Sequence, residues 1–337
     1  MPDTVRWGLL STARINDALI GPIKASPRSE LRAVASRDQA KAGTYAATKG
    51  IPVAHGSYEA LLADPDIDAV YISLPNSLHC QWAVAAAEAG KHILVEKPMA
   101  VSLEEFDRMT AAAQSNGVTL TEAFMYLHHP QTRRALQIIG EGTLGQVQTI
   151  HSWFHFYLPP ENSTNIRLNA ALSGGSLWDV GVYPNSMAIT MAAAAESIVA
   201  PETVIASQII GESGVDVAMR GQLHFPGGVV GQISSGFRTP FREGTWIVGD
   251  AGILHIMEPW KPGLTGRDSV ITLVDRNNAV SQITTTAIDP YLCEVQAMEA
   301  CILDGAPPVV PLAHSRIFLQ SVLALYASAA SGEAVRP

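Results

Sequence analysis

One lysine stands where a binding or catalytic group is expected. Lys97 follows an apolar run, His92–Glu96, that has the length of a buried strand. A buried ammonium group needs a partner or a function, because removing a charge from water is costly. An ion pair with Glu96 is the structural alternative, although adjacent strand residues point to opposite faces. We therefore interpret Lys97 as a functional residue.

A second polar segment, Leu74–His79, stands at the end of the apolar run that begins at Ala69. Ligands of open α/β sheets bind beyond the carboxyl ends of the strands. Both segments are therefore well placed to bind a ligand. The cofactor-binding residues predicted here are Leu74, Pro75, Asn76, His79, Glu96 and Lys97.

The turn after the first apolar run, Val5–Ser11, is where dinucleotide-binding proteins carry G-x-G-x-x-G. Here Ser11, Ala13 and Asn16 occupy the three glycine positions. Ser11 can still cap the next helix, and Ala13 adds only one methyl group where the backbone must approach a pyrophosphate. An ordinary strand-to-helix turn is the alternative. The predicted cofactor contacts from this turn are Ser11, Thr12, Ala13, Arg14 and Ile15.

The second predicted strand ends in Ser36-Arg37-Asp38. An NAD-specific site would place a carboxylate there, on the ribose 2′-hydroxyl. Ser36 and Arg37 instead offer a hydroxyl donor and a guanidinium fork, which suit a 2′-phosphate. A surface arginine is the structural alternative, and Asp38 is a competing carboxylate. The pattern favours NADP, with NAD as the alternative cofactor.

A glycine-rich turn in the second half of the chain, Gly174-Gly175, begins a helix that carries Asp179 and Tyr183. Residues four apart lie on one helical face, so these two side chains are neighbours. The alternative is a capping turn followed by a core tyrosine. His128-His129 suggests a metal pair, but consecutive residues rarely point at one ion, and we expect no metal site.

The first 125 residues alternate apolar, strand-like runs with helix-like segments. Such strands, separated by helices of about 10–15 residues, indicate a parallel sheet covered on both faces. Ser102 and Glu105 form a capping box at the start of one helix. Residues 1–125 are therefore predicted to form a doubly wound α/β domain of the Rossmann type. Its predicted strands are Val5–Ser11, Glu30–Arg37, Ala69–Pro75, His92–Glu96 and Val118–Phe124.

Residues 126–337 are predicted to form an α+β domain around a large, mostly antiparallel sheet with one open face. Turn signals such as Pro226-Gly227-Gly228 separate consecutive strand-like runs, as in hairpins. The predicted strands are Val147–Tyr157, Val204–Ile210, Val217–Phe225, Val229–Phe237, Thr245–Val248, Ile253–Met257, Val270–Val274 and Val280–Thr285. The predicted helices are Gln131–Ile139, Tyr291–Leu303 and Leu312–Ala330.

Composition narrows the class of protein. A length of 337 residues suits two domains, and 47% hydrophobic residues exclude a disordered chain. The net charge of −9 and the lack of any Lys/Arg-rich run argue against nucleic acid as a partner. Three cysteines without zinc spacing suit a reducing cytoplasm. Because no signal peptide or membrane span is recognisable, we expect a soluble cytoplasmic protein without a membrane partner.

Together these motifs resemble the Gfo/Idh/MocA oxidoreductase family, over essentially the whole chain. The family implies a nucleotide-binding domain followed by an open-faced sheet domain, which often packs against another subunit. The residues that carry the resemblance are Glu96-Lys97-Pro98, Pro75–His79, Gly174-Gly175 leading to Asp179, Gly181 and Tyr183, and the segment from Pro290 to Gly305.

Two differences from the common pattern of the family indicate which of its branches the chain resembles. Much of the family carries His where Tyr183 stands and Asp where Met187 stands. Tyrosine is typical of the branch that holds dimeric dihydrodiol dehydrogenases, NADP-dependent D-xylose dehydrogenases and some nucleotide-sugar ketoreductases. The segments Glu122–Tyr126 and His129–Gln131 are similar to the same branch, which also tolerates a serine-containing turn at the position of Ser11.

The resemblance implies hydride transfer between nicotinamide and a carbinol carbon of a sugar or cyclic polyol. Oxidation of an aldose such as D-xylose or D-glucose at C1 is our first interpretation. Reduction of a keto-sugar, including a nucleotide-linked one, and oxidation of a dihydrodiol are the alternatives. Tyr183 would accept the hydroxyl proton while Lys97 favours tyrosinate and orients the substrate. The reverse assignment stays open, and Asp179 would bond substrate hydroxyls or steady Lys97.

Substrate choice is expected to depend on the loops around residues 153–167 and 237–242. Aromatic and polar groups there suit sugar stacking and hydrogen bonding, but they would equally suit a dimer interface. These residues are Trp153, Phe154, His155, Arg167 and Trp246, of which Arg167 is also a predicted cofactor contact. A low content of charged residues, 16%, and an uncovered sheet face predict a homodimer or homotetramer. A non-catalytic NADP-binding sensor is the alternative of another class.

Overall fold

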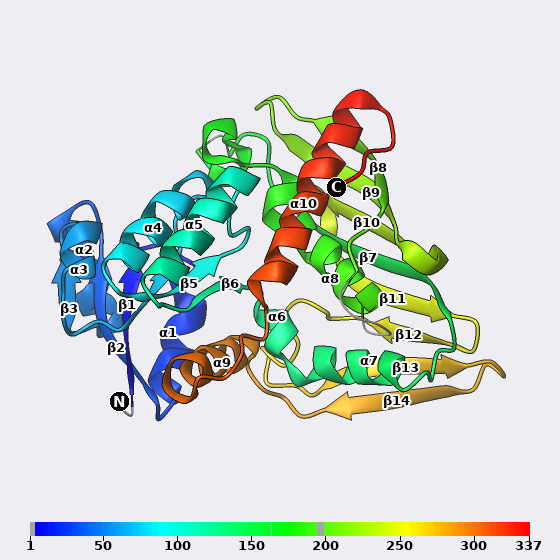
Figure 1. Cartoon of the computed structure of the whole chain (residues 1–337), viewed down its shortest axis with the longest axis horizontal. Helices are drawn as coiled ribbons and strands as arrows, with labels where there is room; N and C mark the ends of the chain where they lie inside the picture. Colours follow the sequence, from blue (N-terminus) through cyan, green and yellow to red (C-terminus); the bar gives the residue numbers. More distant parts are fainter. Residues whose placement is uncertain (1–3, 163, 194–198) are drawn as a thin grey trace. The chain divides into compact units, whose positions relative to one another are not determined.

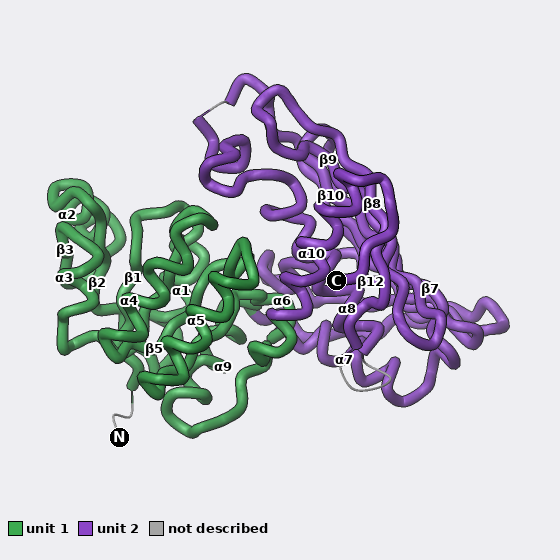
Figure 2. Tube along the Cα trace, turned by 45° about the horizontal axis from the view of Figure 1, so that its top comes forward, with its two compact units in different colours: residues 1–128, 289–315 green, residues 129–288, 316–337 purple. Residues whose placement is uncertain are grey.

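The computed structural model describes residues 4–162, 164–193 and 199–337 in two compact units (Figure 2). Unit 1 comprises residues 1–128 and 289–315, and unit 2 comprises residues 129–288 and 316–337. We expected a division into 1–125 and 126–337, so the structure assigns residues 289–315 differently. This segment contains α9 (Pro290–Asp304), which packs against α1 (Asn16–Ala25) and α6 (Met125–His128) of unit 1.

Unit 1 is built on a six-stranded parallel sheet with the strand order β3-β2-β1-β4-β5-β6. This is the order of a doubly wound dinucleotide-binding fold, which confirms the fold class predicted for the first domain. Right-handed crossovers in opposite directions place α1 and α4 on opposite faces of the sheet (Figure 1). The strands are Val5–Leu10, Ser29–Ala35, Val53–His55, Ala69–Ile72, His92–Glu96 and Leu120–Ala123 in chain order.

The helices of unit 1 begin at side-chain caps that the sequence supplies. Asp38, Ser57 and Ser102 each accept a hydrogen bond from a backbone N–H three residues later. Gly50 ends α2 in the left-handed conformation, with a φ of +61°, which glycine adopts without strain. The remaining helices of this unit are α2 (Gln39–Lys49), α3 (Tyr58–Leu62), a short 3₁₀ turn at Asn76–Leu78, α4 (His79–Glu88) and α5 (Leu103–Ser115).

Unit 2 is built on an eight-stranded sheet with the order β14-β13-β12-β11-β7-β10-β9-β8. All neighbours pair antiparallel except β10 and β7, which run parallel. The predicted, mostly antiparallel sheet is therefore confirmed. The strands from β7 to β14 are Val147–Tyr157, Thr203–Ile210, Asp216–His224, Val230–Gly236, Arg238–Gly249, Gly252–Ile256, Ser269–Asp275 and Val280–Thr285.

Helices cover one face of this sheet. α8 (Val182–Ala193) packs on β7 and β10, and α7 (Pro130–Gly140) packs on β13 (Figure 1). α10 (Leu312–Ser331) lies over β8 and β9, where the Ser328 hydroxyl accepts a hydrogen bond from the Ala206 amide. On the other face, large side chains such as Trp246 and Val280 are exposed, 43% and 66% respectively. The sheet is therefore open on one side.

Two further findings concern membrane spans and the three cysteines. Among the described residues, no helix is long and apolar enough to cross a membrane. The cysteines Cys80, Cys293 and Cys301 are free thiols.

Candidate active site

The turn after β1 is held by a network of side chains in place of the expected glycines. Ser11 has a φ of +155° in the region that favours glycine, and its hydroxyl accepts a hydrogen bond from the Ala13 amide at 3.0 Å. The buried Asn16 donates to the Ser11 carbonyl and accepts from the Ser73 hydroxyl. Ser73 follows β4, so this network joins the carboxyl ends of β1 and β4.

The end of β2 carries an exposed arginine next to a capping aspartate. Burial raises the pKa of Tyr58, and the guanidinium of Arg37 beside its hydroxyl opposes that rise. The carboxylate of Asp38 accepts the Lys41 amide at 2.9 Å as the cap of α2. Asp38 is thereby held at the helix end, while the buried Ser36 donates its amide to His55.

His79 links the ends of β4 and β5. Its Nδ1 lies 2.8 Å from the Pro98 carbonyl and its Nε2 lies 2.9 Å from the Leu74 carbonyl. The ring is fully buried, and burial lowers its pKa. Both ring nitrogens therefore face backbone. The His79 side chain thus holds the two loops together, and the predicted contact of this residue with a cofactor stays a prediction.

Lys97 follows β5 among buried acidic groups of unit 1. Glu122 accepts the Met99 amide at 2.8 Å, and burial raises its pKa to about 7, a rise that the charge of Lys97 partly offsets. Glu96 accepts a short hydrogen bond from the Tyr71 hydroxyl. Glu294, on α9, is also fully buried, and burial raises its pKa well above the ordinary value. Of these acidic groups, Glu122 is one whose pKa the charge of Lys97 lowers, so it is an acidic neighbour of the lysine within unit 1.

In unit 2, neighbouring atoms approach the backbone of Gly174 and Gly175 so closely that both positions of this turn require glycine. A Cβ atom on Gly174 would lie 2.6 Å from the Arg167 carbonyl oxygen. Gly175 has a φ of +127°, and a Cβ atom there would lie 2.2 Å from a carboxylate oxygen of Asp216. A π-helical turn at residues 177–181 follows and leads into α8. Such turns are rare and are found frequently at functional sites.

Asp216 anchors this turn from β9. Its carboxylate accepts the Ser176 hydroxyl at 2.7 Å, the Leu177 amide at 2.9 Å and the Tyr326 hydroxyl at 2.7 Å. It is 2% exposed. The segment that carries Asp179 therefore begins at a buried, charge-assisted network.

Asp179 forms an ion pair with Arg167, in which Nε donates to a carboxylate oxygen at 2.6 Å. The Arg167 guanidinium also lies 5.9 Å from the centre of the Phe156 ring. Arg167, which we predicted as a cofactor contact, is thus brought together with the predicted catalytic residue Asp179 within unit 2.

Tyr183 lies in an aromatic cluster in unit 2. Its ring centre is 5.5 Å from that of Phe154 and 5.5 Å from that of Trp260. The Phe154 and Trp260 rings stack at 5.9 Å, and Phe241 contacts Phe154 edge-on. Trp260 is fully buried and Tyr183 is 7% exposed. The accessible part of this aromatic surface is therefore formed by Phe154, which is partly buried, and Phe241, which is exposed.

Three residues that we expected near the substrate lie on the other face of the sheet. Neighbouring residues on a strand point to opposite faces, so Trp153 and His155 point away from the face that Phe154 shares with Tyr183. Trp246 pairs with His151 and lies on that same open face. This position favours their alternative role in an interface over a contact with a sugar that binds beside Tyr183, and both roles stay predictions.

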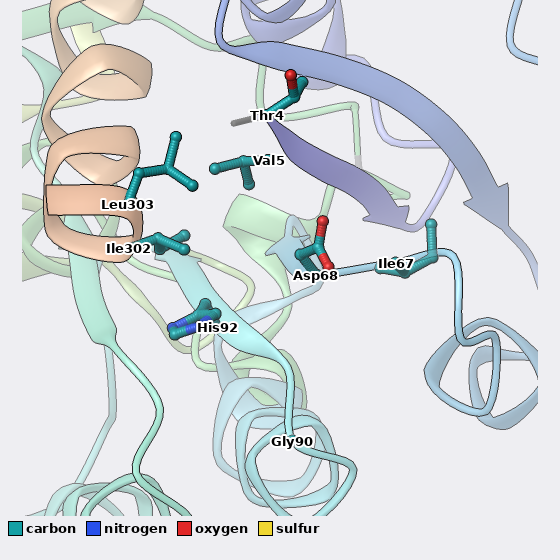
Figure 3. A pocket seen from close by; sticks show the side chains of 8 residues that line it. All are labelled: Thr4, Val5, Ile67, Asp68, Gly90, His92, Ile302 and Leu303. Atoms are coloured by element: carbon teal, nitrogen blue, oxygen red, sulfur yellow. The ribbon is translucent and has the colours of Figure 1, made fainter. Parts of the chain in front are cut away.

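One pocket in unit 1 lies away from these residues (Figure 3). It is lined by Val5, Asp68, His92 and Leu303, among others, at the amino-terminal ends of β1, β4 and β5. Open α/β sheets bind ligands at the opposite edge. The pocket contains none of the predicted site residues.

Comparison with known proteins decides the family. Residues 5–124 match the model of the oxidoreductase family with an NAD-binding Rossmann fold, named after Gfo, Idh and MocA, and residues 132–255 match the C-terminal domain of that family. The chain belongs to the Gfo/Idh/MocA oxidoreductase family. The resemblance inferred from the motifs is confirmed.

Individual members of the Gfo/Idh/MocA family are similar over nearly the whole chain. D-xylose 1-dehydrogenase (NADP(+)) 2 from Haloferax volcanii is 36% identical over 98% of each chain. Trans-1,2-dihydrobenzene-1,2-diol dehydrogenase from Bos taurus is 29% identical over 93% of each. The crystal structure of a 3-ketoreductase from Actinomadura kijaniata, in complex with NADP and TDP-benzene, superposes with a TM-score of 0.88 at 29% identity, covering 96% of this chain and 98% of that one.

Sequence reasoning missed several residues that position the segments of the candidate site. Asn16 was recognised only as a lost glycine, although an amide at that position is itself a signal for side-chain bridging. Asp216 and Trp260 carried no local signal, because their partners are distant in sequence. Among the described residues, no group of His, Cys, Asp or Glu is arranged to hold a metal ion, and His129 instead caps α7 through Nδ1.

Proposed function

We propose that the protein is an NADP-dependent dehydrogenase that oxidises an aldose such as D-xylose or D-glucose at C1. The observation that carries this proposal is the aromatic surface around Tyr183, next to the polar pair Arg167 and Asp179 on the same segment of unit 2. A pyranose has one apolar face and a rim of hydroxyls, so it suits stacking on rings with polar groups at their edge. The similarity to a D-xylose 1-dehydrogenase over 98% of both chains supports it.

The residues of unit 1 fit a nicotinamide dinucleotide with a 2′-phosphate. The network of Ser11, Asn16 and Ser73 holds the strand ends where a pyrophosphate binds in this fold. Arg37 is exposed at the end of β2, and the competing carboxylate of Asp38 is engaged as a helix cap. These residues would hold NADP, which supplies the hydride acceptor when it is bound.

In the proposed mechanism the substrate hydroxyl must lose a proton as hydride leaves the carbon. A free tyrosine has a pKa near ~10 and is a poor base at neutral pH. We assign Tyr183 as the proton acceptor and Lys97 as the cation that favours tyrosinate and polarises the substrate oxygen. Lysine as the base with tyrosine as the donor is the alternative. Asp179, oriented by Arg167, would accept hydrogen bonds from substrate hydroxyls.

The test is a substrate screen of the purified protein. With NADP and a panel of aldoses, polyols and dihydrodiols, we expect NADPH absorbance to rise with an aldopyranose. If only a keto-sugar is turned over, with consumption of NADPH, the protein is a ketoreductase like the structural relative from Actinomadura kijaniata. If NADP binds tightly and no compound reacts, the sensor interpretation replaces the enzyme.

We also propose that the open sheet face is buried between two copies of the chain, giving a homodimer or a pair of dimers. Large apolar side chains are exposed on several of its strands, and burial against a second copy would remove them from water. The exposed residues that support this are Tyr157, Ile205, Ile209, Trp246, Met257 and Val280.

A further inference from the structure

A carboxylate that the mechanism does not use lies on the Tyr183 face of the large sheet. Glu243 on β11 pairs directly with Phe154 on β7. The next pair on this face, Thr245 and Ser152, joins its hydroxyls by a hydrogen bond of 2.8 Å. Because directly paired residues project to the same face, the Glu243 carboxylate lies beside the Phe154 ring.

This position brings Glu243 to the edge of the aromatic surface around Tyr183. Phe154 contacts Tyr183 at 5.5 Å and stacks on Trp260 at 5.9 Å. Trp260 is followed by Lys261, whose charge acts on Glu243. The Glu243 carboxylate therefore lies beside Phe154, and the Phe154 ring lies between it and Tyr183, the proposed proton acceptor.

Within the described residues, the Glu243 carboxylate has no hydrogen-bond or ion-pair partner. A partly buried carboxylate is costly unless a donor satisfies it. Burial raises its pKa to about 7; the charge of Glu258 adds to the rise and that of Lys261 opposes it. A ligand with hydroxyl groups would supply the hydrogen-bond donor that the described part of the protein does not provide.

We propose that Glu243 is a specificity-determining residue that accepts a hydrogen bond from a ring hydroxyl of the substrate remote from the reacting carbon. This inference rests on the proposed function and narrows its substrate class. The substrate is then a polyhydroxylated ring with one apolar face on Phe154 and Phe241, the two rings of the cluster that are not buried, and a hydroxyl directed at Glu243. A substrate with only two adjacent hydroxyls, such as a dihydrodiol, keeps one hydroxyl next to the reacting carbon and has none remote from it for this contact.

The experiment compares Glu243→Gln with a matched control, Glu258→Gln. Glu258 is a neighbouring acid, but it is exposed and pairs with Arg267 at 3.4 Å. With D-xylose and NADP, we expect Glu243→Gln to raise KM by about 10- to 100-fold, the worth of one hydrogen bond to a charged group, with kcat within about threefold. Measured well above pH 7, where Glu243 is ionised with or without the charge of Glu258, the control should change neither. The dissociation constant for NADP should be unchanged in both variants, which shows that both are folded.

Two further readouts separate recognition of a hydroxyl from loss of packing. Among monodeoxy analogues of D-xylose, one should be discriminated against by the wild type and no longer by Glu243→Gln. In addition, the carboxylate accepts a hydrogen bond best when ionised, so the wild-type KM should fall as pH rises through about 7. The groups known to act on this titration are Glu258 and Lys261. The Gln variant should lose that part of the pH profile.

The outcomes distinguish the inference from the proposed function. If the wild type oxidises D-xylose or another aldopyranose but Glu243→Gln behaves like Glu258→Gln, the inference alone is overturned. If the wild type oxidises no aldopyranose, the proposed function is overturned and the inference with it. A higher KM together with lost discrimination of one deoxy analogue supports the proposal.

Discussion

From the buried hydrogen-bond network around Asp216 we predict how strongly the segment that carries Asp179 depends on one carboxylate. Replacing Asp216 by Ala removes the acceptor of three hydrogen bonds, from Ser176, Leu177 and Tyr326. The Ser176 hydroxyl keeps a partner, because it lies 3.1 Å from the Ser235 hydroxyl. The Leu177 amide and the Tyr326 hydroxyl lose the acceptor that Asp216 provides.

The expected cost follows from these two groups. A buried polar group left without its partner costs about 1–3 kcal/mol, so two of them give a loss of about 2–6 kcal/mol in the free energy of unfolding. Asp216→Asn keeps one acceptor oxygen but turns an amide N–H₂ toward a donor. It should therefore lose about half as much.

The assay is equilibrium unfolding in urea of Asp216→Ala, Asp216→Asn and a control, Asp275→Ala, followed by fluorescence. Asp275 accepts two backbone amides, from Asn277 and Ala279, but in an exposed turn where water can replace it. We expect the control to lose less than about 1 kcal/mol, because exposed polar groups are rehydrated. Activity should fall in both Asp216 variants, since the segment that carries Asp179 begins at this network.

One result would refute the reasoning. If Asp216→Ala is no less stable than Asp275→Ala, the network does not anchor the turn, and the placement of Asp179 must depend on the Gly174-Gly175 backbone alone. A loss of stability with full activity would show instead that the anchor supports the fold but not the site.

Three further predictions concern chemistry, cofactor and assembly. Tyr183→Phe should lower kcat by about 10²–10⁴-fold and leave the NADP dissociation constant unchanged, and Lys97→Met should cost at least as much; a Tyr183→Phe enzyme within threefold of the wild type would transfer the base role to Lys97 or His129. Arg37→Ala should weaken NADP binding by about tenfold or more and leave NAD binding nearly unchanged, as measured by titration calorimetry; equal losses for both would mean that Arg37 stacks on the adenine. Light scattering should show a dimer or tetramer that Trp246→Glu dissociates, and a stable wild-type monomer of 35.9 kDa would contradict the proposed interface.

Local patterning was enough to predict the secondary structure that carries the site. The strand-like runs His92–Glu96, Val147–Tyr157 and Val280–Thr285 are strands with the same bounds in the structure. β11 is longer than the predicted Thr245–Val248, because only its second half is apolar. Its polar first half is held in the strand by pairing with β7, as between Arg238 and Tyr157.

The sequence by itself determined the family, the order of the two folds and the candidate residues, since motifs and periodicity are read over neighbouring positions. Only the tertiary structure decided which face each side chain occupies and what it contacts. Helices cover one face of the large sheet, so Phe154 joins Tyr183 while the adjacent Trp153 does not. Asp216 meets Ser176 across 40 residues of chain, and residues 289–315 return to the first unit. These contacts arise from the folding of distant segments onto each other, and no local pattern encodes such partners.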